Sequence, residues 1–196
     1  MKKLLSIFLF FFALTESFSQ DASGKEEITF TVDTVNSYIF WHCDSHYGTV
    51  PLKSGEVKVS GEDILEGQFV IKMDSIHDED IDYDLMRKTL NNTLRSEFFF
   101  DVKNYPYSEF EIYYTEKKQD RYRIVGNLKI KGIVKCIEFP AKIDWSARSF
   151  DAVSDTFKID RLDWGIDIYS QAKAENDESV IISDSIDFVI HVKAMR

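Results

Sequence analysis

The chain has 196 residues and carries 34 acidic against 24 basic residues, a formal net charge of −10 at pH 7. That surplus argues against nucleic acid and against anionic membrane surfaces as partners, because both need clustered lysine and arginine. Three prolines, eight glycines and a hydrophobic content of 44% fit one globular domain with a sizeable core.

The amino terminus has the layout of a cleavable secretory signal. Lys2 and Lys3 provide a positive start, an apolar run follows over residues 4–14, and small residues stand at Ser17 and Ser19. An apolar run of this length is too short to cross a bilayer, which needs about 20 residues. The pattern therefore predicts a signal peptide that is cleaved near Ser19.

This prediction divides the chain into three parts. Residues 1–19 form the signal peptide, residues 20–27 form a polar, disordered segment, and residues 28–196 form one domain. We expect the mature protein in the periplasm or secreted, without a stable membrane anchor. An uncleaved segment that serves as an anchor is the alternative.

The dominant pattern after the amino terminus has a period of two. For example, Tyr122, Ile124 and Leu128 alternate with Arg123 and Asn127. One apolar and one polar face are typical of an antiparallel sheet, and so many neighbouring strands favour a sandwich or a closed barrel. Strands are expected near residues 27–33, 37–45, 49–60, 65–75, 108–117, 121–131, 133–145, 153–163 and 179–193.

One segment breaks this pattern and predicts a short amphipathic helix near residues 84–95. Apolar residues recur at helical spacing at Leu85, Met86, Leu90 and Leu94. Such a helix can pack across one mouth of a barrel, with the phenylalanines at 98–100 as apolar anchors. The alternative is that these residues simply belong to the core.

The two cysteines are predicted to be free thiols. By alternation, Cys43 shares a face with Ile39 and Trp41 and points inward, whereas Cys136 lies on the outward face of its strand. Side chains on opposite faces of a sheet do not reach the Cβ separation of about 3.8 Å that a disulfide needs.

The histidines and the acidic run do not predict a metal site or a cofactor. His42 and His46 are four residues apart, which suits a helix, but they stand in a predicted strand where that spacing separates side chains. His77 and His191 complete no ligand motif. Residues 77–84 are rich in aspartate but lack the glycine and terminal glutamate of an EF-hand loop, so we expect a solvated loop.

The order and spacing of several motifs resemble the YceI-like family. The segment at 94–106, LRSEFFFDVKNYP, resembles the family pattern L-R/K-S-x-x-F-F-D-V-x-x-Y-P. Further resemblances lie at 32–37, 46–55, 67–76, 126–135 and 163–166. The resemblance implies an all-β fold, a secreted, extended antiparallel lipocalin-like β-barrel of about eight strands that is associated with polyisoprenoid lipids.

The chain departs from the family pattern at three positions. Thr93 stands where the family often has histidine, Phe98 replaces an acidic residue, and Cys136 replaces a proline. These changes make the mouth more apolar, and any polar role of those family residues toward a ligand head group does not carry over.

The resemblance implies a non-enzymatic binding protein whose partner is a polyisoprenoid or other long-chain apolar ligand. No nucleophile, phosphate-loop or dinucleotide motif is present in the sequence. A structural envelope protein with a filled lumen, and an enzyme acting on a lipid or quinone, remain the alternatives, and a homodimer is left open. The predicted lumen residues are Ile39, Trp41, Phe69, Ile71, Met73, Phe110, Ile112, Tyr122, Ile124, Leu128, Ile137, Phe139, Phe157 and Phe188.

Overall fold

The computed structural model describes residues 26–170, 172 and 181–196. The predicted signal peptide, its cleavage near Ser19, the segment 20–25 and the first two residues of the last predicted strand lie outside the described residues. No described helix is long and apolar enough to span a membrane.

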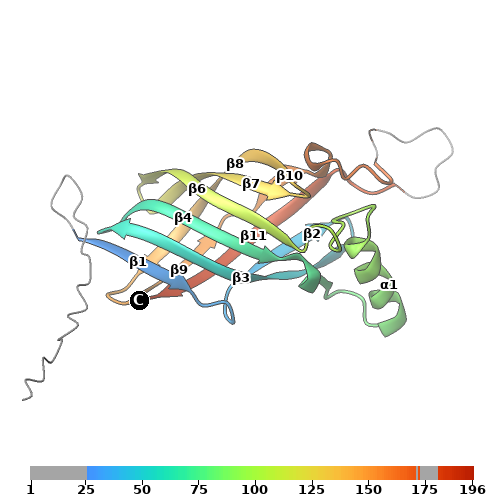
Figure 1. Ribbon diagram of the computed structural model, residues 1–196, viewed down its shortest axis with the longest axis horizontal. Helices are drawn as coiled ribbons and strands as arrows, with labels where there is room; N and C mark the ends of the chain where they lie inside the picture. Colours follow the sequence, from blue (N-terminus) through green and yellow to red (C-terminus); the bar gives the residue numbers. More distant parts are fainter. Residues whose placement is uncertain (1–25, 171, 173–180) are drawn as a thin grey trace, which may run out of the picture.

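The described chain is built mainly from β-strands (Figure 1). A single α-helix, α1 (Asp84–Arg95), and two short 3-10 helices, η1 (Met73–Ser75) and η2 (Arg161–Trp164), interrupt them in the described residues. The strands are β1 (Glu27–Val32), β2 (Tyr38–Cys43), β3 (His46–Ser60), β4 (Asp63–Lys72), β5 (His77–Asp78), β6 (Tyr107–Lys118), β7 (Arg121–Ile130), β8 (Ile133–Trp145), β9 (Ser149–Ser154), β10 (Phe157–Asp160) and β11 (Ser185–Met195).

Eight of these strands close into an antiparallel ring. The order is β11-β2-β3-β4-β6-β7-β8-β9, and β9 pairs back onto β11. Closure gives hydrogen-bond partners to the backbone N–H and C=O groups that an open sheet leaves unpaired at its edges. The prediction of an antiparallel barrel of about eight strands with one short helix is confirmed.

Two positions in the ring are each occupied by two short strands, which lie one after the other along their longer neighbours. Between β11 and β3, β2 pairs with residues 46–51 of β3 and β1 pairs with residues 56–60. Along the other side of β11, β9 covers residues 191–195 and β10 covers residues 185–188. The long strand β11 thus holds four short strands together.

Several predicted boundaries are wrong. The strand expected over 65–75 ends at Lys72, because the chain turns into η1. The strand expected over 153–163 is in fact the end of β9, then β10 and η2, with a break at Asp155, whose N–H donates to the Pro140 carbonyl. The predicted disordered segment extends too far, since Glu27 begins β1 and forms an ion pair with Lys58 at 2.6 Å.

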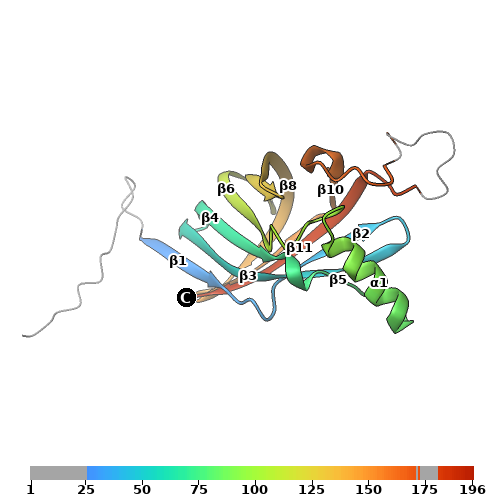
Figure 2. The ribbon, with the colours of Figure 1, turned by 45° about the vertical axis from the view of Figure 1, so that its right-hand side comes forward.

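Helix α1 has the predicted span and lies at the end of the barrel opposite the carboxyl terminus (Figures 1 and 2). Its last turn is anchored, since Leu94 is buried together with Phe99 and Phe100. Its first turn is not, because Leu85 and Met86 are more than 60% exposed. The prediction that the helix packs across the mouth is therefore correct for Leu90 and Leu94 but not for Leu85 and Met86. Of the three predicted phenylalanine anchors, Phe98 is wrong, since it is 59% exposed.

Candidate functional site

The barrel encloses a cavity of about 500 Å³. Thirteen of the fourteen predicted lumen residues line its wall. They are Ile39, Trp41, Phe69, Ile71, Met73, Phe110, Ile112, Ile124, Leu128, Ile137, Phe139, Phe157 and Phe188. The volume lies within the range of about 300–1,000 Å³ that is usual for small-molecule pockets.

Tyr122 points inward, as predicted, but belongs to the packed end of the barrel and not to the cavity wall. Its ring packs edge-on against Trp145, and Trp145 in turn contacts Phe150 at a centroid distance of 5.1 Å. The Trp145 Nε1 donates to the Tyr122 hydroxyl at 3.0 Å. Together with Phe30, these residues form an aromatic plug near the carboxyl-terminal end of the barrel.

Five phenylalanines from five strands form a continuous belt in the cavity wall. Neighbouring rings lie 4.6–6.3 Å apart, and the pair Phe139–Phe157 is stacked at 4.6 Å with an interplanar angle of 14°. The members of this phenylalanine belt are Phe69, Phe110, Phe139, Phe157 and Phe188. Aromatic pairs at such spacings add stability beyond the area they bury, so the belt gives the lumen a rigid, flat-sided wall.

Gly126 of β7 is required by this belt. A Cβ at that position would lie 2.5 Å from the ring of Phe110 and equally close to the carbonyl oxygen of Glu111. Glycine therefore lets the Phe110 ring lie against the backbone of the next strand.

The cavity wall includes many residues beyond those that the sequence singled out. Some follow directly from alternation, because Ile186 and Ile190 share the inward face of β11 with Phe188. Others lie at the end of the barrel that carries α1, in loops or in the helix itself, where strand alternation gives no signal. This end, called the mouth below, is lined by Asp44, Ser45, His46, Leu90, Leu94, Ile181 and Ile182.

Arg161 is a buried cation in the cavity wall, but its guanidinium is fully engaged. It forms an ion pair with Asp184 at 3.1 Å and is 1% exposed. At 2.8–3.1 Å it also donates to the backbone carbonyls of Ile166, Ile168, Ile182 and Ser183. Arg161 thus links residues 166–168 to residues 182–184 at the mouth.

One buried donor in the wall has no such partner. The indole N–H of Trp41 lies in a side chain that is 5% exposed, and no acceptor lies within hydrogen-bond distance among the described residues. A buried polar group without a partner costs free energy, and functional sites often contain one.

The cysteine prediction is confirmed. Both thiols are free, Cys43 lines the cavity and Cys136 is exposed on the outside of β8. Burial, together with the nearby Asp44 carboxylate, raises the pKa of Cys43 to about 11. Cys43 therefore remains a neutral thiol at physiological pH and is a poor nucleophile.

Only part of the acidic run is the solvated loop that the sequence predicts, since residues 79–83 form an exposed to half-buried loop before α1 but residues 77–78 do not. Residues 77–78 form β5, which pairs with β3, and Asp78 is 1% exposed. Burial and the neighbouring Asp80 raise the pKa of Asp78 above its ordinary value. Burial acts in the same direction on Asp80, but the neighbouring Asp78 carboxyl and the hydrogen bonds with the Tyr47 N–H and His46 outweigh it and lower the pKa of Asp80.

The model of the YceI-like domain matches residues 23–194. Among curated proteins, none matches the chain. Several solved structures match it. BcnA of Burkholderia cenocepacia has a TM-score of 0.66 at 20% identity, over 84% of this chain and 99% of its own.

Two further structures share the fold. A polyisoprenoid-binding domain from Saccharophagus degradans, implicated in plant cell-wall breakdown, has a TM-score of 0.60 at 14% identity, over 85% of this chain and 97% of its own. The YceI protein of Campylobacter jejuni has a TM-score of 0.53 at 23% identity, over 68% of this chain and 73% of its own.

Proposed function

Because the chain belongs to the YceI-like domain family, we propose that it binds a polyisoprenoid or similar long-chain amphiphilic lipid in the lumen of its barrel. The protein sequesters or carries this lipid and performs no chemistry on it. The polyisoprenoid-binding domain from Saccharophagus degradans, which has the same fold, supports the choice of ligand class.

The apolar cavity is the observation that carries this proposal. At about 24 cal/mol per Å³, an unfilled apolar cavity of about 500 Å³ forgoes on the order of 12 kcal/mol of packing, which is comparable with the whole stability of a domain. If the protein needed only a stable barrel, larger side chains that filled this space would increase its stability. The alternative of a structural protein with a filled lumen therefore has less support.

The cavity volume sets the scale of the ligand. At about 30 Å³ per methylene-sized group, close to the share of one liquid water molecule, the lumen takes on the order of 15–20 such groups. That corresponds to three or four isoprene units of about five carbons each. At about 0.8 kcal/mol per buried methylene, the gross gain is about 12–16 kcal/mol, enough for tight binding after the cost of association.

The polar groups in the wall support binding over catalysis. The Arg161 guanidinium is held by carbonyl groups and Asp184, and the Ser154 hydroxyl accepts from the Ile190 N–H. The Trp41 N–H has no acceptor among the described residues, and we infer that an oxygen of the ligand accepts from it. An amphiphile that carries a hydroxyl, carbonyl or phosphate oxygen satisfies this donor, whereas a pure hydrocarbon does not.

Lipid extraction and native mass spectrometry of protein purified from its own host test the proposal. We expect one bound species of the mass of an isoprenoid or a similar amphiphile, and its loss after delipidation. Delipidated protein should then take up long isoprenoid alcohols one to one. Protein that contains no lipid and takes up none would argue for a structural role.

We also propose that the mature protein acts in the periplasm or outside the cell. The support is the charged start, short apolar run and small residues of the segment 1–19. Mass spectrometry of the intact protein from cell fractions tests this, with an amino terminus just after Ser19 as the expected result.

A further inference from the structure

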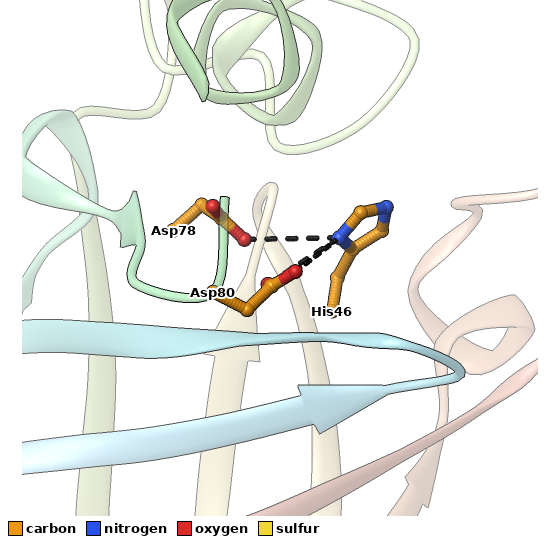
Figure 3. Close-up of side chains that lie close together, drawn as sticks. All are labelled: His46, Asp78 and Asp80. Carbon is orange, nitrogen blue, oxygen red and sulfur yellow. Dashed lines mark hydrogen bonds and ion pairs between the residues drawn. The ribbon is translucent and has the colours of Figure 1, made fainter. Parts of the chain in front are cut away.

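Three side chains that could ligate a metal converge at the mouth of the barrel (Figure 3). The His46 Nδ1 lies 3.1 Å from the Asp80 Oδ2 and 3.8 Å from the Asp78 Oδ2. All three ligand atoms lie within 4.8 Å of one another. His46 is more than 30 positions from the two aspartates in sequence, and it meets them because β5 pairs with the start of β3.

The backbone builds this arrangement. Gly48 of β3 pairs with Asp78, and a Cβ on Gly48 would lie only 2.0 Å from the His77 carbonyl oxygen. Glycine therefore permits the close approach that carries Asp78 to His46. The Asn91 Oδ1 of α1 accepts from the Asp78 N–H at 2.8 Å and fixes β5 from the other side.

Each carboxylate is oriented through one of its two oxygens. The Asp78 Oδ1 accepts from the Ile81 N–H at 3.0 Å, and the Asp80 Oδ1 accepts from the Tyr47 N–H at 2.9 Å. The Oδ2 atom of each is left directed at the imidazole (Figure 3). Outer hydrogen bonds of this kind hold metal ligands in place and raise affinity.

One of these oxygens is buried without a hydrogen-bond partner. The Asp78 side chain is fully inaccessible, and its Oδ2 has no donor within reach among the described residues apart from the ion-pair contact with His46 at 3.8 Å. Burial of a carboxylate oxygen without a donor is costly. A bound cation between the three side chains removes this cost.

We propose that His46, Asp78 and Asp80 bind a divalent transition-metal ion of the Zn²⁺ class at the mouth of the barrel. A tetrahedral ion with bonds of about 2.0–2.1 Å separates its ligand atoms by about 3.3–3.4 Å, close to the observed 3.1 and 3.8 Å. One imidazole with two carboxylates suits zinc better than calcium, which prefers six to eight oxygens. Because the His46 side chain is 42% exposed, the fourth position is open to water.

Isothermal titration with zinc chloride, after chelator treatment and dialysis of the purified protein, tests this site. We expect one equivalent of Zn²⁺ with a dissociation constant in the micromolar range or below. His46→Ala and Asp80→Asn should each weaken binding by about 100-fold or more, since even the loss of an outer partner costs about 10- to 100-fold. Calcium chloride should bind far more weakly.

His42→Ala is the matched control, because His42 has similar exposure and also pairs with an aspartate, Asp187, at 3.8 Å. It should leave zinc binding unchanged. Circular dichroism and the Tm of each variant show whether it is folded, and Zn²⁺ should raise the Tm of the wild type and the control but not of His46→Ala. No zinc binding by the wild type, equal binding by His46→Ala, or tighter binding of Ca²⁺ than of Zn²⁺ would overturn the proposal.

Discussion

Replacement of Ile124 by tryptophan shortens the lumen while keeping it apolar. Ile124 lines the cavity, is 4% exposed and lies two residues from Tyr122 of the aromatic plug. A larger ring there occupies the closed end. Tryptophan has about six more side-chain heavy atoms than isoleucine, and displacing as many ligand methylenes costs up to about 5 kcal/mol of binding at about 0.8 kcal/mol each.

The effect on stability separates an open lumen from a filled one. In a tightly packed core, such an enlargement costs about 1–3 kcal/mol. For a domain of this size, that cost lowers the Tm by roughly 2–12 °C. With a cavity of about 500 Å³ beside Ile124, the ring enters free space, and we expect the Tm to change by less than about 2 °C.

The assay is displacement of a fluorescent fatty-chain probe by isoprenoid alcohols of increasing length. Affinity for the longest alcohols should fall by about 100-fold, or about 2.7 kcal/mol, and affinity for the shortest should fall less. Val153→Trp, on the outward face of β9, is the matched control and should change neither quantity. A clear drop in Tm for Ile124→Trp, with no lipid bound by the wild type, would refute the reasoning.

Three further outcomes are expected. Iodoacetamide at about pH 8 should modify Cys136 and spare Cys43, because burial raises the pKa of Cys43 to about 11. Mass spectrometry follows both thiols, and equal modification of the two would contradict the buried position of Cys43. Trp41→Phe should change the unfolding free energy by less than about 1 kcal/mol. In calorimetry, it should weaken the binding of an isoprenoid alcohol about fivefold and leave the binding of the corresponding hydrocarbon unchanged. Arg161→Met should cost about 3–5 kcal/mol in urea unfolding, because its carbonyl and carboxylate partners lose their buried donor, and a loss below about 1 kcal/mol would contradict that role.

Alternation along the chain was enough to predict the barrel wall. In a strand, successive side chains point to opposite faces, so the inward face of Ile124, Leu128 and Phe139 can be read from local sequence alone. The same rule predicted the opposite orientations of Cys43 and Cys136. Motif order then favoured a barrel over a sandwich, which periodicity by itself does not distinguish.

Alternation gives the face of a residue but not its depth along the barrel. Tyr122 has the correct face, yet it lies in the aromatic plug, because depth depends on how the closed ring staggers its strands. The exposed first turn of α1 shows the same limit, since its apolar stripe does not reveal how far the helix extends beyond the rim.

Fold class, strand faces and free thiols were determined by the sequence itself, because each follows from local geometry. The cavity volume was decided by tertiary structure, since it is the difference between the space inside the ring and the side chains that fill it. The cluster of His46, Asp78 and Asp80 was decided there too. These residues show no ligand spacing in sequence, and only the pairing of β5 with β3 beside Gly48 brings their side chains together.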